Sequence, residues 1–191
     1  MADEPEFDPP YVADREVYGA HSHDQLWNLV HEALDPTALG EVAATWQYQA
    51  DAVGAAFRTF ADTVRGEFER WSGRARAAAE PVTEAFIAHG GTSAEICALL
   101  RQIMEADAEA AQTIRDALPE PRGYLPLPDP VAEAVHGGVR RMAHDIAAAA
   151  ALADARDIMT FRYNSTLAAS GDRVPRFTPA PQPDSGGGRR L

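Results

Sequence analysis

The stretch DPTALGEVAATWQYQADAVGAAFRTFADTVRGEFERWSG, Asp35 to Gly73, decides the fold. It opens with Asp35-Pro36, and Asp is a good helix N-cap while proline is favoured at the first helical position. Apolar residues then recur every three or four positions, which predicts one amphipathic helix of almost five heptads. These positions are Leu39, Val42, Trp46, Ala50, Val53, Phe57, Phe60, Val64, Phe68 and Trp71. We expect Trp71 to be the last buried position of this helix.

A second apolar stripe follows the Trp71-Ser72-Gly73 stretch, so these three residues are predicted to form a bend between two long helices. A helix of the first length extends roughly 50 Å, and a chain this small can cover it only with another long helix. The HGGTS segment, residues 89–93, either separates two helices or lies within one. Because Phe86 and Ile96 keep the helical register across it, we favour one continuous, bent helix. Pro81 indicates a kink or a later start.

Shorter segments flank this hairpin. Ser22 and Gln25 have capping-box spacing and begin a predicted short amphipathic helix, while Asp129-Pro130 begins a third long amphipathic run that extends to Tyr163. The sequence therefore predicts an all-α fold, an elongated bundle in which a long antiparallel hairpin packs with a short leading helix and a long trailing helix. Its expected parts are an extended arm (1–20), a helical domain (21–169) with a bend at 71–73 and a rigid connector at 118–129, and a disordered Pro/Gly-rich tail (170–191).

Composition excludes several classes of function. The 191-residue chain has a formal net charge of -12, and all 17 of its basic residues are arginine. That charge argues against a nucleic acid or an anionic membrane as partner. No apolar run is long enough for a membrane span, and the acidic start lacks the features of a signal peptide. We therefore expect a chain made in the cytoplasm that, if exported, uses no cleavable signal.

The sequence offers no constellation for catalysis and no cofactor site. No two of the six histidines have the i, i+4 spacing of a helical zinc site, and no HExxH motif occurs. The single cysteine, Cys97, has no CxxC partner and is expected to be a packed thiol. Ser72 lies in WSG, which lacks the setting of a nucleophile elbow. A helical enzyme or metal protein remains an alternative of another class.

Apolar surface is the more informative feature. The stripe that ends at Trp71 is wide, because phenylalanines at 57, 60 and 68 are flanked by alanines, and two helices cannot cover such faces by themselves. The excess predicts a partner helix or self-association. The residues expected at a partner interface are Trp46, Val53, Phe57, Phe60, Val64 and Phe68.

Two long helices joined at Trp71-x-Gly73 resemble the WXG100 superfamily of type VII (ESX) secretion systems in actinobacteria, and in particular its PPE-like branch. The segment REVYGAHSHDQLW, Arg15 to Trp27, is similar to the PPE pattern of a Tyr-Gly element, a serine and a short helix. Trp46 also resembles a PPE position. Where PPE proteins carry Pro-Pro-Glu, this chain has Pro9-Pro10-Tyr11.

The resemblance implies a non-enzymatic, secreted protein that pairs with a small PE-like or WXG100 helical hairpin. In the family a YxxxD/E export motif lies beside the WxG bend, and no tyrosine here is followed by an acidic residue four positions later. The partner is therefore expected to supply that motif, with Trp71 and Gly73 as the other half of the signal. The resemblance also implies a cytosolic chaperone and the ESX ATPase as partners, with Tyr124, Leu125 and Leu127 as the candidate chaperone contact.

The implied destination is the cell envelope or the extracellular space. A second, also non-enzymatic, hypothesis is a secreted helical protein that assembles into homo-oligomers through its apolar faces.

Overall fold

The computed structural model describes residues 6–11 and 14–181, and the regular structure in those ranges is helical. The α-helices there are α1 (His23–Asn28), α2 (Pro36–Phe68), α3 (Gly73–Ala117), α4 (Pro130–Ile158) and α5 (Leu167–Ser170). Tyr18–Ala20 and Gly171–Arg173 form 3-10 turns, and Leu29–Ala33 and Met159–Tyr163 form π-helical turns. The predicted all-α class is confirmed. Within the same ranges, no helix combines the length and apolar character that a membrane crossing requires.

The local signals for helix starts act as expected. The Ser22 hydroxyl accepts a hydrogen bond from the Gln25 backbone N–H, and the Gln25 side chain accepts one from the Ser22 N–H, which completes the capping box of α1. The Asp35 carboxylate accepts from the N–H groups of Thr37 and Ala38 at the start of α2. Asp129 caps α4 through the Val131 N–H. These caps satisfy backbone donors that have no partner inside the helix.

Contacts divide the chain into two compact units. Unit 1 consists of Met1–Asp8, Glu41–Met104 and Val174–Leu191, and unit 2 consists of Pro9–Gly40 and Glu105–Arg173. Both long helices, α2 and α3, therefore contribute residues to each unit. The predicted helical domain at 21–169 is likewise shared between them.

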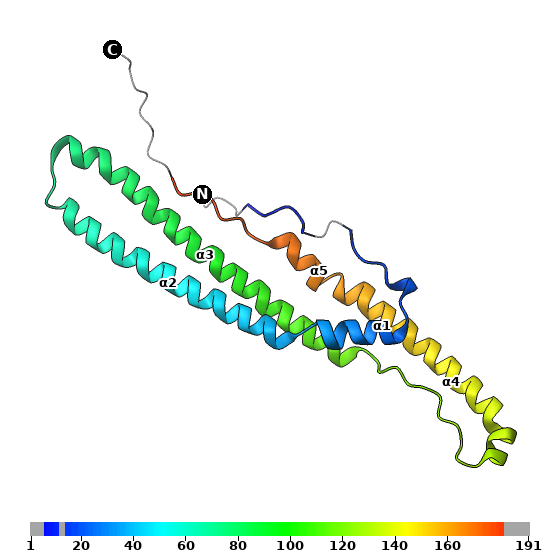
Figure 1. Ribbon diagram of the computed structural model, residues 1–191. Coiled ribbons are helices and arrows are strands. Elements are labelled where there is room, and N and C mark those ends of the chain that lie inside the picture. The colour runs from blue at the N-terminus through cyan, green and yellow to red at the C-terminus, as the bar shows by residue number, and fades with distance from the viewer. Residues whose placement is uncertain (1–5, 12–13, 182–191) are drawn as a thin grey trace. The chain divides into compact units, whose positions relative to one another are not determined.

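In unit 1, α2 and α3 lie side by side and run in opposite directions (Figure 1). Residues later in α2 contact residues earlier in α3, as expected for antiparallel helices. The contacting pairs are Gly54–Ala94, Phe57–Gly90 and Arg65–Glu84. The α2–α3 contact is close at Gly90, where an added Cβ would lie 2.0 Å from the ring of Phe57. Small residues thus set the distance between the two helices.

Helix α3 is continuous through the HGGTS segment, as favoured from the register of its apolar residues. It also runs through Pro81, which lies inside the helix. The thiol of Cys97 is buried on this helix, and burial raises its pKa. A buried, protonated thiol fits the expected packing role.

The bend differs in detail from the prediction. Helix α2 ends at Phe68 rather than at Trp71, and α3 begins at Gly73, whose φ of 74° is the left-handed conformation that glycine adopts without strain. Phe68 is buried, whereas Trp71 is 47% exposed and its ring meets that of Phe68 edge-on at 5.6 Å. The expectation that Trp71 is the last buried position is therefore wrong. Helix α2 ends three residues earlier, so Trp71 does not continue its buried side.

Unit 2 has a core in which one end of α3 meets α1 and the second half of α4. Its buried members are Tyr18, Leu26, Val30, Ile114, Leu118, Ala155 and Met159. Tyr18 belongs to the segment predicted as an extended arm, yet it is only 1% exposed. Burial, with Glu16 and Tyr163 nearby, also raises the pKa of its phenol. A second polar group is buried at Asp107, which accepts a hydrogen bond from the Ser170 hydroxyl at 2.8 Å.

Segments near the two ends of the chain pair within unit 1. The Asp8 N–H donates to the Val174 carbonyl at 2.9 Å, and the Arg176 N–H donates to the Glu6 carbonyl at 2.7 Å. Part of the predicted tail, residues 174–176, therefore lies in a backbone contact with part of the predicted arm. Residues 1–5, 12–13 and 182–191 of those two segments lie outside the described residues.

Candidate protein–protein interface

One side of α2 in unit 1 presents mainly apolar side chains. Val42, Trp46, Val53, Phe60 and Val64 are spaced by four, seven, seven and four residues, which places them on the same side of the helix. Val42 and Phe60 are exposed, and the other three are half-buried. No charged residue interrupts the set.

Helix α3 extends this apolar side. Val82 and Phe86, one turn apart, are 43% and 38% exposed, and the Phe86 ring meets that of Phe60 at 5.8 Å in a T-shaped contact. We call this combined surface the hairpin face: Val42, Trp46, Val53, Phe60, Val64, Val82 and Phe86. Contiguous apolar surface spread over two helices is typical of an interaction site on a soluble protein.

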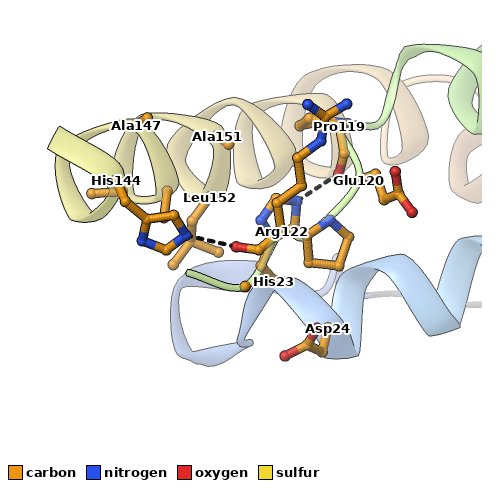
Figure 2. A pocket seen from close by; sticks show the side chains of 13 residues that line it. His23, Asp24, Pro119, Glu120, Arg122, His144, Ala147, Ala151 and Leu152 are labelled. Carbon is orange, nitrogen blue, oxygen red and sulfur yellow. Dashed lines mark hydrogen bonds between the residues drawn. The ribbon is translucent and has the colours of Figure 1, made fainter. Parts of the chain in front are cut away.

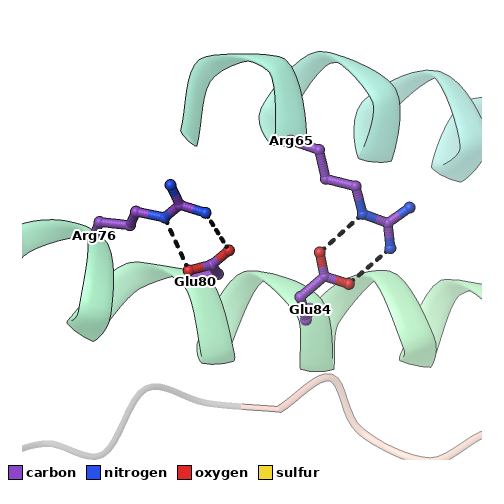
Figure 3. Close-up of polar contacts among 4 residues, drawn as sticks. All are labelled: Arg65, Arg76, Glu80 and Glu84. Atoms are coloured by element: carbon purple, nitrogen blue, oxygen red, sulfur yellow. Dashed lines mark hydrogen bonds and ion pairs between the residues drawn. The ribbon is translucent and has the colours of Figure 1, made fainter. Parts of the chain in front are cut away.

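The opposite side of the same helix pair carries charge. Arg65 of α2 donates from Nε and Nη2 to both carboxylate oxygens of Glu84 of α3, at 2.9 and 2.7 Å, and Arg76 pairs with Glu80 along α3 (Figure 3). Hydrogen bonds from these arginines lower the pKa of Glu84 and of Glu80. A polar, ion-paired side needs no cover from a partner, so the two sides of the helix pair are distinct in chemistry.

The structure sorts the residues predicted for a partner interface into two groups. Trp46, Val53, Phe60 and Val64 lie on the hairpin face. Phe57 and Phe68 instead pack inside the helix pair, Phe57 over Gly90 and Phe68 in a buried position next to the bend. The spacing of apolar residues cannot distinguish these two groups. It shows which side chains lie on the same side of α2, but not which of them α3 covers.

Sequence reasoning did not assign the α3 half of the hairpin face. Val82 and Phe86 belong to the second apolar stripe, and the signal that could have found them is the phase of that stripe relative to the first. Trp71 lies exposed at the bend and Gly73 supplies its positive φ.

The connector after α3 folds back onto α4 in unit 2 and borders an open pocket of about 740 Å³. Figure 2 shows two histidines that hold its backbone: His23 of α1 bonds the Pro119 carbonyl at 2.6 Å, and His144 of α4 bonds the Arg122 carbonyl at 2.9 Å. Each imidazole nitrogen donates here, since a carbonyl only accepts.

The predicted chaperone-contact residues sit further along the connector and differ in exposure. The Tyr124 hydroxyl donates to the Glu133 carboxylate at 2.7 Å, and the Leu127 N–H donates to the same carboxylate at 2.8 Å. These bonds lower the pKa of Glu133, the Leu127 N–H having the larger effect. Leu125, by contrast, is 79% exposed. Of the three, only Leu125 offers most of its side chain to a partner.

The connector contact should depend on pH through His144. Its second nitrogen, Nδ1, lies 3.1 Å from the Asp145 carboxylate, so both nitrogens face acceptors and both bonds form only in the imidazolium. The Arg122 carbonyl and then the Asp145 carboxylate raise the pKa of His144. A raised pKa means that the contact is complete below the ordinary imidazole pKa of about 6.5 and weakens as pH rises through the raised value.

We therefore expect residues 120–127 to exchange backbone hydrogens more slowly at pH 5.5 than at pH 8, after correction for intrinsic exchange rates. In His144→Gln, whose amide can donate to the carbonyl but does not titrate, that difference should disappear. An unchanged pH dependence in the glutamine variant would assign it to another group.

Neither known proteins nor a metal-binding geometry points to a function for the described residues. Neither a family model, a curated protein nor a solved structure matches the chain. Among the described residues, no group of three or more His, Cys, Asp or Glu side chains is placed to hold a metal ion.

Proposed function

We propose that this chain is a non-enzymatic, PPE-like substrate of a type VII (ESX) secretion system, and that it pairs with a small PE-like or WXG100 helical hairpin. The observation that carries the proposal is the hairpin face, an apolar surface built from both helices that meet at the WxG bend. Two helices of a partner laid on it would complete a four-helix bundle, with α1 as the leading helix and α4 as the trailing helix of the PPE-like arrangement.

The chemistry of the face fits a helical partner. Its side chains repeat at helical spacing and are large and apolar, and burying them stabilises a complex by roughly 25 cal/mol per Å² of apolar surface. An amphipathic helix recognised through such a stripe is a common mode of binding. The opposite side carries the Arg65–Glu84 ion pair and is unsuited to an apolar helix, so the partner is expected to bind only the hairpin face.

Pairing is tested with the full chain and a PE-like or WXG100 helical hairpin that carries the YxxxD/E motif, co-expressed and measured by native mass spectrometry and calorimetry. Phe60→Glu should weaken a 1:1 complex by at least about 100-fold, because it buries an unpaired carboxylate. Thr59→Glu is the matched control, since it adds the same charge to the adjacent position on the outward side of α2. A stable monomer that binds no such hairpin, or equal weakening by both variants, would refute the proposal.

The bend is proposed to act as half of a composite export signal. Trp71→Ala removes an exposed indole and should leave the 1:1 complex intact while it lowers the secreted fraction to less than about a tenth, the size of effect expected for a Trp hot spot. Immunoblots of culture medium and cell lysate measure this fraction, with Ser72→Ala as the control. Equal export of the Trp71 variant would remove the signal role and leave the pairing unaffected.

The remaining partners are proposed on the same resemblance. A cytosolic chaperone would contact the connector at Tyr124, Leu125 and Leu127 before export by the ESX ATPase, and the exported complex would reach the cell envelope or the medium. Homo-oligomerisation through the apolar faces is the second candidate, and the exposed surface of α4 is the observation that favours it.

A further inference from the structure

Helix α4 carries an exposed apolar stripe in its first half. The α4 stripe consists of five side chains on one side of the helix, each at least 66% exposed: Val131 (71%), Val135 (68%), Val139 (77%), Met142 (66%) and Ile146 (67%). The second half of the same helix behaves differently, since Ala155 is fully buried in the unit 2 core, as is Met159 in the π-helical turn that follows the helix. The described residues therefore cover one half of α4 and leave the other open.

The charge around the stripe is balanced, unlike that of the chain. Residues 130–153 contain two acidic side chains, Glu133 and Asp145, and two basic ones, Arg140 and Arg141, whereas the whole chain has a formal net charge of -12. Two copies of an acidic protein repel one another over most of their surfaces. Because residues 130–153 carry no net charge, two copies that meet through this part of α4 avoid local electrostatic repulsion.

The spacing of residues in the stripe is also symmetric about its centre. Val131 and Val135 are four residues apart, Met142 and Ile146 are four residues apart, and the midpoint of both sets falls between Gly138 and Val139. Two antiparallel copies with a two-fold axis at this midpoint place Val131 opposite Ile146 and Val135 opposite Met142. An isologous interface requires this kind of self-complementarity.

Gly138, next to the axis, has no evident role within one copy. An added Cβ there would meet no atom within 4 Å, although glycine costs a helix about 1 kcal/mol relative to alanine. The neighbouring Gly137 is different, because an added Cβ would lie 2.3 Å from the Glu133 carboxylate that holds the connector. A glycine at a helix crossing lets two backbones approach closely.

We propose that the α4 stripe is a homodimer interface, in which α4 of a second copy packs antiparallel across Gly138 and Val139. The stripe is separate from the hairpin face, so this inference does not depend on pairing with a helical-hairpin partner; it rests on and deepens the second candidate function, homo-oligomerisation. Five side chains form a small interface, for which a dissociation constant of about 1–100 µM is expected.

The first test measures the mass of the full chain by sedimentation equilibrium over a wide concentration range. The wild type should shift from monomer to dimer, and Val139→Glu should raise the dissociation constant by at least about 100-fold, since two carboxylates then face each other across the axis. Thr59→Glu, an equal charge on α2, should leave the constant unchanged. A monomer at every concentration, or a dimer insensitive to Val139→Glu, overturns the proposal.

The second test fixes the orientation by cysteine cross-linking in a Cys97→Ser background. Gly138→Cys should form a disulfide-linked dimer under mild oxidation. Val131→Cys should not link to itself, because the two copies of residue 131 would lie about 22 Å apart along the antiparallel helices, but it should link to Ile146→Cys when the two variants are mixed. Self-linking of Val131→Cys without the mixed product indicates a parallel pair and overturns the arrangement.

Discussion

Replacement of Gly90 by alanine is expected to lower the free energy of unfolding by about 3 kcal/mol, an overpacking cost at the upper end of the usual range. The added methyl would lie 2.0–2.3 Å from three atoms of the Phe57 ring. That ring is itself held against Phe86 at 5.2 Å, so it has little room to move without opening the α2–α3 contact. Urea unfolding followed by circular dichroism measures the loss.

Gly91 supplies the matched control. It is the next residue of α3, and a Cβ added there would meet no atom within 4 Å. Gly91→Ala should therefore stabilise the protein by up to about 1 kcal/mol through helix propensity alone. Equal effects of the two alanines would mean that Phe57 does not pack over Gly90 and that α3 meets α2 through other residues.

Replacement of Arg115 by methionine is expected to cost about 2–3 kcal/mol, since hydrogen bonds from a charged donor contribute about that much. Nη1 of Arg115 donates to the carbonyls of Val30, His31 and Leu34, at 3.1, 3.1 and 2.6 Å. These carbonyls end the leading helical segment, where the next helical turn is missing. Methionine keeps much of the aliphatic length and removes only the donors.

Arg76→Met, on the same helix, is the control for Arg115→Met. The Arg76–Glu80 pair spans one exposed turn, and such pairs contribute little. Urea unfolding should therefore separate the two variants by about 2 kcal/mol. Hydrogen exchange should also show faster exchange at residues 29–34 only in the Arg115 variant. A small effect of Arg115→Met would mean that water replaces the guanidinium at these carbonyls.

The helices themselves could be predicted because their signals are local. Caps at Ser22, Asp35 and Asp129 mark where α1, α2 and α4 begin, and the apolar spacing carries α3 unbroken past Gly90-Gly91. The predicted end of α2 was wrong, because there the apolar spacing competes with the backbone geometry that the turn requires. At the bend the apolar spacing continues to Trp71, but the chain leaves the helix at Phe68 to reach the left-handed conformation at Gly73.

The candidate site could be predicted only in part. The sequence placed six residues of α2 on one stripe, of which Phe57 and Phe68 pack inside the helix pair, and it did not single out Val82 and Phe86 of α3. Contact of any of these residues with a partner stays a prediction. Choosing among these residues requires the rotation of one helix about its axis relative to the other. That rotation is set by contacts such as Phe57 over Gly90, which join residues far apart in the sequence.

By itself, the sequence determined the all-helical class, the helix starts and the set of residues on each apolar stripe, because spacing and capping act within one helix. Only the tertiary structure decided which stripe residues stay open: the hairpin face on α2 and α3, and Val131 to Ile146 on α4. Whether an apolar side chain is covered depends on the neighbour that packs against it, and no pattern within one helix contains that information.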